Sequence, residues 1–266
     1  SNFSGGCFAN VKLNHELFSL PATKNIYVFP QMGDGGNALG GALNVATSKT
    51  SKTHFDFPTV YLGPEYSDDQ ILSELKRNNL NFHKLNSKNK SELVSEQIVK
   101  GEIVGWFQGK MEYGPRALGG RSILVDASKA EVTSKLNRKL QRNDFMPFAP
   151  VTIDIWAERC FVGWKPDHIA SKFMTTCYKC TDLLKEKCPA IVHLDNTARP
   201  QVVFRDENSE YYDTIKLYIE KTGNPAIINT SFNFHEEPIV MSPHDAINCY
   251  LDKNITALVI GNYLVL

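Results

Sequence analysis

The chain reads IVGWFQGKMEYGPRALGGRS from Ile103 to Ser122, and this stretch decides the expected fold. Its first part, residues 103–107, is a short apolar run, and this pattern predicts a buried strand. The part that follows, from Gln108 onward, is polar and rich in glycine, with no apolar stripe to bury. The stretch therefore predicts a strand that leads directly into a loop.

Three fixed cations lie in this loop: Lys110, Arg116 and Arg121. Glycines and a proline separate them, and glycines let a backbone approach a ligand closely with its N–H groups exposed. Guanidinium groups match phosphate and carboxylate oxygens in bidentate pairs. We therefore expect an anion-binding loop, with phosphate as the anion. The alternative is an ordinary surface loop, because glycine and proline alone indicate only a turn.

Strand and helix patterns alternate along the chain around this loop. Capping boxes or proline and glycine signals mark helix ends at Ser67, Ser128, Ser242 and Gly223. We expect strands at 26–29, 59–62, 150–153, 190–194, 201–204, 225–228 and 257–260, and helices at 38–46, 91–100, 211–221 and 242–251. This alternation predicts an α/β fold, a twisted mixed sheet with helical cover.

Two polar connections divide the chain, at residues 48–58 and 86–90. We therefore expect an N-terminal part over residues 1–58, a connecting segment over 59–90 and a self-contained α/β domain over 91–266.

Further polar residues stand where expected strands begin or end: Arg142, His193, Arg199, Asn229, Ser231 and Asn233. Because ligands bind at the carboxyl ends of strands in open α/β sheets, we expect one convergent pocket. Each residue also has a structural alternative. His193 could be a buried core histidine, the asparagines could hold turns, and Arg142 could be a cation favoured at the end of a helix.

Two glycine-rich turns lie near the start of the chain, at Gly5-Gly6 and Gly33–Gly36. Glycine turns that lead into helices suit nucleotide or phosphate contact. Asp34 lies within the second turn, where a simple turn role is the alternative.

Lys plus Arg and Asp plus Glu balance at 29 each, so no net charge draws the chain to nucleic acid or to a membrane. No apolar run approaches the roughly 20 residues of a membrane span, and the first residues do not resemble a signal peptide. We therefore expect a cytoplasmic protein that binds neither.

These motifs together resemble the ATP-dependent O-carbamoyltransferases of the NodU/CmcH type. The resemblance covers nearly the whole chain and rests on Ser4–Asn10, Gly33–Gly40, Tyr61–Ser67, Lys110–Ser122, Phe145–Pro150, His193–Gln201 and Asn229–Ile239. It implies that residues 1–58 are the end of a transferase domain of the actin-like ATPase superfamily. It also implies that residues 91–266 resemble threonylcarbamoyl-AMP synthase.

The resemblance implies two reactions. The C-terminal domain would combine carbamoyl phosphate with ATP, which carries Mg²⁺, to form carbamoyl-adenylate with release of phosphate and pyrophosphate. The N-terminal domain would transfer the carbamoyl group to the hydroxyl of a small-molecule acceptor with help from a metal, iron in the characterised type.

The resemblance also assigns roles to residues. It implies catalytic roles for Lys110, Arg116, Arg121 and His193, and contacts to carbamoyl phosphate and ATP for Arg142, Arg199, Asn229, Ser231 and Asn233. Gly5, Gly6 and Asn10 would face the adenylate, and Asp34 would be a metal ligand.

The sequence departs from the family in one respect. The family's two metal-binding histidines form an H-x-x-x-H helix upstream of the first glycine turn, and the seven histidines here include no such pair. We therefore expect a C-terminal portion of a longer enzyme. Two alternatives stay open: an enzyme like threonylcarbamoyl-AMP synthase, and a non-catalytic RNA-binding module with a local basic patch.

Overall fold

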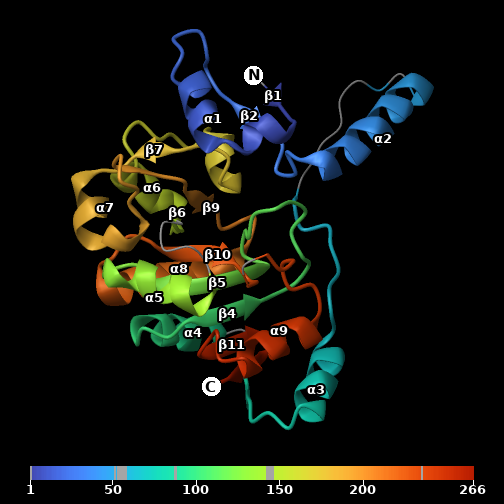
Figure 1. Ribbon diagram of the computed structural model, residues 1–266, viewed down its shortest axis with the longest axis vertical. Coiled ribbons are helices and arrows are strands. Elements are labelled where there is room, and N and C mark those ends of the chain that lie inside the picture. The colour runs from blue at the N-terminus through green and yellow to red at the C-terminus, as the bar shows by residue number, and fades with distance from the viewer. Residues whose placement is uncertain (1, 51, 53–58, 87–88, 142–146, 235) are drawn as a thin grey trace.

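The computed structural model describes residues 2–50, 52, 59–86, 89–141, 147–234 and 236–266. Its main feature is an eight-stranded sheet in the order β3-β12-β11-β4-β5-β10-β6-β9 (Figure 1). The β4–β11 and β6–β9 pairs are parallel and the other pairs are antiparallel, so the sheet is mixed. The strands are β3 (His83–Lys84), β4 (Val104–Phe107), β5 (Arg121–Asp126), β6 (Ala149–Ile153), β9 (Gln201–Val203), β10 (Ile227–Ser231), β11 (Ala257–Ile260) and β12 (Tyr263–Val265).

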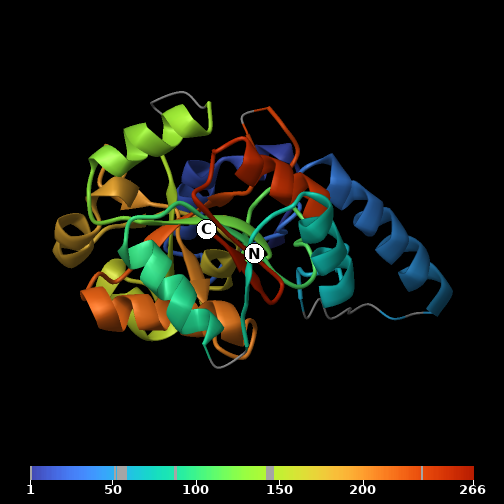
Figure 2. The same ribbon diagram turned by 90° about the horizontal axis from the view of Figure 1, so that it is seen from below.

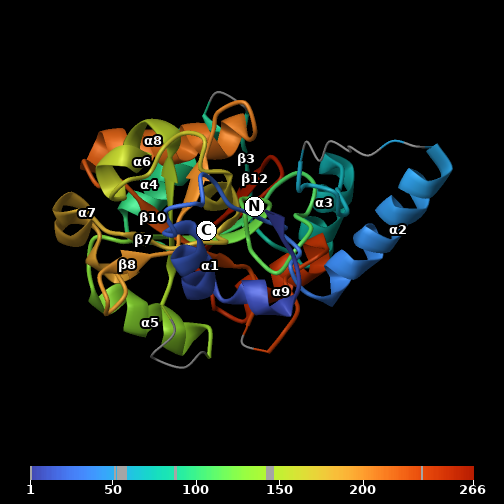
Figure 3. The same ribbon diagram turned by 90° about the horizontal axis from the view of Figure 1, so that it is seen from above.

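Helices cover both faces of this sheet. Helices α4 (Lys90–Val99) and α8 (Ser209–Thr222) lie on one face, and α5 (Glu131–Lys139) and α9 (Pro243–Leu251) lie on the other (Figures 2 and 3). The remaining elements of this part are the helices α3 (Asp68–Arg77), α6 (Asp154–Cys160) and α7 (Asp182–Lys187), the short 3₁₀ helices at Ile169–Phe173 and Pro189–Ile191, and the two-stranded sheet of β7 (Tyr178–Lys179) with β8 (Thr197–Ala198).

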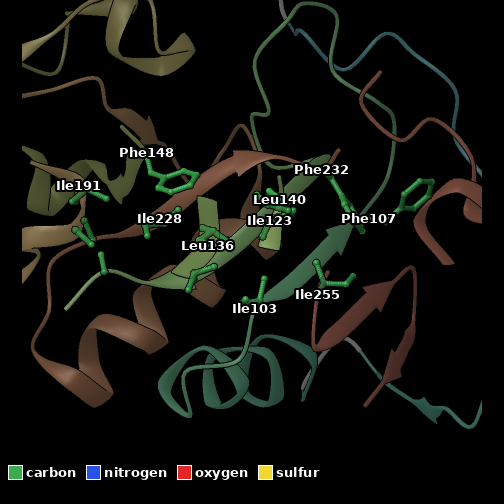
Figure 4. Close-up of a cluster of buried hydrophobic side chains, with 14 of the residues drawn as sticks. Ile103, Phe107, Ile123, Leu136, Leu140, Phe148, Ile191, Ile228, Phe232 and Ile255 are labelled. Atoms are coloured by element: carbon green, nitrogen blue, oxygen red, sulfur yellow. The ribbon is translucent and has the colours of Figure 1, made fainter. Parts of the chain in front are cut away.

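The alternation of side chains along each strand builds two apolar cores. In β10, Ile228 belongs to the core beneath α5 and α9, whereas Ile227 belongs to the core beneath α4 and α8. In β5, Ile123 belongs to the core beneath α5 and α9, and Leu124 belongs to the core beneath α4 and α8. Figure 4 shows the first core, where Ile123 and Ile228 lie with Leu136 and Leu140 of the α5 region. A sheet buried on both faces needs apolar residues at nearly every strand position, as β11 and β12 have.

The N-terminal part packs against this body through α1 (Val11–Phe18). It contains β1 (Asn2–Phe3) paired in parallel with β2 (Tyr27–Val28), and a short 3₁₀ helix at Gly6–Ala9. The amide of the buried Asn14 donates to the carbonyl of Thr175 at 2.7 Å, and the Phe18 ring meets His168 edge-on. Helix α2 (Asp34–Thr50) extends away from the rest of the chain (Figure 1).

The structure confirms the mixed α/β fold and corrects several expected elements. The expected strand at 190–194 is wrong, because Pro189–Ile191 forms a 3₁₀ turn. The expected cap at Ser128 is also wrong, since its hydroxyl donates to Asp126 and α5 begins later without a side-chain cap. Around Tyr61 the structure has only an isolated bridge to Glu112 in place of a strand. Conversely, β5 was not expected, and it is a central strand.

Gly105 in β4 tests the packing of the sheet. A Cβ at this position would lie 2.4 Å from Ile255 Cδ1 and 2.6 Å from Phe232 Cζ. We expect Gly105→Ala to lower the free energy of unfolding by roughly 1–3 kcal/mol through overpacking. Gly40→Ala in α2 is the matched control, because nothing lies within 4 Å of its Cβ. Urea unfolding of both variants checks this, and equal stabilities would contradict the assigned core.

Candidate functional site

A pocket of about 390 Å³ opens where the glycine-rich loop, β10 and the 193–199 turn meet. It brings together six of the residues expected from the sequence: Arg116, His193, Arg199, Asn229, Ser231 and Asn233. Val11, the first residue of α1, also lines the pocket, so the N-terminal part contributes to its wall. The expected convergence of separate motifs on one pocket is therefore present in the structure.

The two pocket arginines lie close enough to repel each other. Burial, and to a smaller extent the charge of Arg116, together lower the pKa of Arg199 to about 9. Burial also lowers the pKa of Arg116. Neither guanidinium forms an ion pair with a carboxylate of the residues that the structure describes. Two unneutralised cations in one partly buried pocket favour binding of an anion.

A compact turn holds His193 beside these arginines. The backbone N–H of His193 donates to the carbonyl of Thr197 at 2.8 Å, and the Thr197 hydroxyl lies 3.3 Å from the ring atom Nδ1 of His193. Asp195 accepts from the Thr197 hydroxyl at 2.7 Å and pairs with Lys12 of α1. Burial lowers the pKa of His193; Asp195 opposes this shift, whereas Arg199 adds to it. The imidazole is therefore mainly neutral at pH 7 and able to accept a proton.

The glycine-rich loop is held from inside by a buried carboxylate. Glu112 Oε1 accepts the N–H groups of Leu118, Gly120 and Arg121 at 2.6, 2.9 and 3.2 Å. The Gly119 N–H donates to the Ser122 hydroxyl at 3.1 Å. These four N–H groups turn away from the pocket, so the expectation that they would face a ligand is wrong. The loop presents the Arg116 side chain instead.

The carbonyls of the same loop are also occupied. Asn229 donates to the carbonyl of Ala117 at 3.0 Å, and Trp106 donates to that of Gly119 at 2.8 Å. Tyr61 and Gln201 both donate to the carbonyl of Leu118, each at 2.8 Å. Because its backbone groups are paired on both sides, the loop is fixed before any ligand arrives.

Arg121 lies beneath the loop and outside the pocket lining. Its guanidinium donates to the carbonyls of Gln108, Gly109, Gly120 and Pro64 at 2.9–3.2 Å. It also lies over the Phe107 ring, 3.7 Å from the ring centre. Its side chain is buried and holds the loop to β4. The structure therefore gives Arg121 a structural position in place of the expected contact with substrate. Lys110 is exposed and does not line the pocket either.

The expected adenylate and metal residues lie in the N-terminal part, outside the pocket lining. The Asn10 side chain caps α1 by accepting from the N–H groups of Lys12 and Leu13, and Gly5 and Gly6 precede it. Asp34 is exposed at the start of α2. In the described part of the chain, no group of three or more His, Cys, Asp or Glu side chains could hold a metal ion, so these residues alone do not fit the expected metal. Arg142 lies outside the described residues.

Sequence reasoning missed the residues that position the loop. Glu112 lies within the quoted stretch, but a carboxylate among cations was not recognised as an internal acceptor. The feature that could have identified Glu112 is its position in the sequence, close to glycines whose backbone N–H groups need an acceptor. Gln201 and Tyr61 come from distant segments, and no local pattern marks them as partners of Leu118.

Glu112 tests the internal support of the loop. Glu112→Ala removes the acceptor of three N–H groups, and we expect it to lower the free energy of unfolding by about 3 kcal/mol or more. Glu112→Gln keeps an oxygen at the same place and should retain most of that stability. Chemical denaturation measures the free energy of unfolding of both variants, and an assay of phosphate binding shows whether the pocket is kept. Equal effects of Ala and Gln would contradict the proposed acceptor role.

Comparison with known proteins agrees with these observations. Residues 95–266 match the family described as Carbamoyltransferase C-terminus, and residues 2–43 match Carbamoyltransferase N-terminus. Among the described residues, none of the helices has the length and apolar character needed to cross a membrane.

Several curated relatives align along almost the whole chain. An uncharacterized protein of Methanocaldococcus jannaschii is 38% identical over 98% of this chain and 43% of its own length. Nodulation protein NolO of Bradyrhizobium diazoefficiens is 35% identical over 98% of this chain and 48% of its own. The 3'-hydroxymethylcephem-O-carbamoyltransferase of Streptomyces clavuligerus is 27% identical over 97% and 47%. The chain thus spans about half the length of these relatives or less.

Among solved structures, full-length HypF in a phosphate- and nucleotide-bound form is similar over 65% of this chain and 25% of its own, with 20% identity and a TM-score of 0.46. The assignment rests on the sequence matches, which extend over both parts of the chain. The chain belongs to the carbamoyltransferase family.

Proposed function

We propose that the pocket binds carbamoyl phosphate and that the C-terminal part of the chain converts it, with ATP, to carbamoyl-adenylate. The observation that carries this proposal is the convergence of Arg116 and Arg199 without a carboxylate partner among the described residues. A phosphate dianion would neutralise both cations and would accept bidentate hydrogen bonds from their guanidinium forks. Family membership supports the carbamoyl group as the remainder of the ligand.

The proposed reaction needs a group that accepts a proton from water, and we give this role to His193. If both phosphate and pyrophosphate leave, one water must enter: its oxygen replaces the phosphate on the carbamoyl carbon and gives carbamate. A carbamate oxygen then attacks the α-phosphorus of ATP, and pyrophosphate departs. A neutral His193 in the pocket can accept the proton of that water. The arginines neutralise the departing phosphate.

We further propose that the carbamoyl group then passes to the hydroxyl of a small-molecule acceptor at a site built by the N-terminal part of the family. Residues 1–58 would be the end of that part, residues 59–90 a connection and residues 91–266 the adenylate-forming domain. The relative from Streptomyces clavuligerus, named for a hydroxymethylcephem, supports a hydroxyl acceptor in general. We derive no metal-dependent step for this chain, because Asp34 alone does not fit a metal site.

Arginine substitutions test the anion pocket. We expect Arg116→Ala and Arg199→Ala each to weaken carbamoyl phosphate and inorganic phosphate binding by at least tenfold, since charged hydrogen bonds contribute about 1.5–3 kcal/mol. Arg116→Lys should recover little, because lysine lacks the planar fork. Titration calorimetry measures these affinities, and pyrophosphate release from ATP measures the reaction.

Arg205→Ala is the matched control, since Arg205 is exposed and pairs with Asp213 on the surface. Without ligand, the two pocket variants should be no less stable than the wild type, because each removes a cation that its neighbour repels. Wild-type affinity for carbamoyl phosphate in both pocket variants would overturn the proposed site.

A further inference from the structure

Asn229 lies in the middle of β10, between β5 and β6, and lines the pocket. Its side chain is 1% exposed. The Nδ2 group donates to the carbonyl of Ala117 at 3.0 Å and to Gln201 Oε1 at 2.7 Å. The other polar atom, Oδ1, is buried and has no hydrogen-bond partner among the residues that the structure describes. A buried acceptor left unpaired is costly, and native structures usually retain one for a reason.

The orientation of this amide is determined by its neighbours. The carbonyl of Leu118 can only accept, so the Gln201 atom bonded to it at 2.8 Å must be Nε2. Gln201 Oε1 is therefore the atom that faces Asn229, and it requires a donor. The carbonyl of Ala117 requires a donor as well. Both contacts fix Nδ2 on the loop side, so within the described part of the chain Oδ1 is the atom left without a partner.

The polarity of the pocket is thus divided. Arg116 and Arg199 supply donors that suit phosphate oxygens, whereas Asn229 Oδ1 is an acceptor that suits an N–H or O–H group on the ligand. Carbamoyl phosphate offers partners to both groups: its phosphate oxygens accept hydrogen bonds, and the amino group on its carbonyl carbon donates them. Acetyl phosphate has the same carbonyl and phosphate but carries a methyl group in place of the amino group.

We propose that Asn229 Oδ1 accepts a hydrogen bond from the amino group of carbamoyl phosphate and so selects the carbamoyl group over other acyl groups. This inference rests on the proposed function, since it concerns how the same pocket recognises the amino group of the ligand in addition to its phosphate. A site built to bond an N–H group rejects an analogue that lacks it, because the buried acceptor then stays unpaired. Gln201 acts as a positioning residue, since it fixes the amide without contacting the ligand.

The test compares three ligands on the whole chain by titration calorimetry: carbamoyl phosphate, acetyl phosphate and inorganic phosphate. We expect the wild type to bind carbamoyl phosphate about 10- to 100-fold more tightly than acetyl phosphate. Asn229→Leu should reduce that ratio to about one, and its affinity for inorganic phosphate, measured alongside, reports any movement of the loop at Ala117. Asn248→Leu, on the exposed face of α9, is the matched control and should keep the wild-type ratio.

Two further measurements keep the inference falsifiable. If Asn229→Leu binds no phosphate, Asn229→Ala is measured instead, because its smaller side chain admits water beside Ala117 and Gln201. Gln201→Leu should lower the ratio partially, since only one of two contacts that orient the amide remains. Equal binding of acetyl and carbamoyl phosphate by the wild type, or an unchanged ratio in both Asn229 variants, would overturn the role of Asn229 alone. Failure of the wild type to bind either carbamoyl or inorganic phosphate would overturn the proposed function itself.

Discussion

The Glu112 carboxylate is the contact on which the pocket depends. One of its oxygens gathers three N–H groups of the glycine-rich loop, within a site from which solvent is largely excluded. A charged acceptor gives stronger hydrogen bonds than a neutral one. The loop closes around it, and the glycines are needed because the backbone bends tightly there: Gly119 has a φ of +101°, and a Cβ on Gly120 would meet the carboxylate at 2.7 Å. The position of Arg116 follows from this closure.

Arg121 completes the arrangement from the other side. Burial lowers the pKa of its guanidinium to about 10, while the charge of Glu112 acts in the opposite direction. Its five hydrogen bonds to backbone carbonyls join β4, the loop and Pro64. The loop therefore contains two arginines with opposite uses. Arg121 donates from both terminal nitrogens to carbonyls and holds the structure, whereas Arg116 is left with its charge facing a pocket.

The sequence indicated the parts of this architecture that depend on local pattern. The apolar run at 103–107, the cap at Ser242 and the stop at Gly223 all correspond to observed elements, since each depends on neighbouring residues. It could not show that β5 begins at Arg121, because the first residues of that strand are polar and are buried only by β4 and β10 on either side. For the same reason Asn229 was expected after a strand, although it lies within one. The division of the arginines into structural and pocket residues also depends on three-dimensional contacts.

The internal pairing of the loop has a consequence for how a ligand would enter. Flexible phosphate-binding loops lose conformational entropy when they close on their ligand, and that loss reduces affinity. Here the peptide groups from Leu118 to Arg121 are already ordered by Glu112, Ser122, Tyr61 and Gln201 when the chain folds. The entropy is lost once, during folding, and not again at each encounter. The loop itself therefore needs no closing movement to receive a ligand, and its ordering adds no slow step to association.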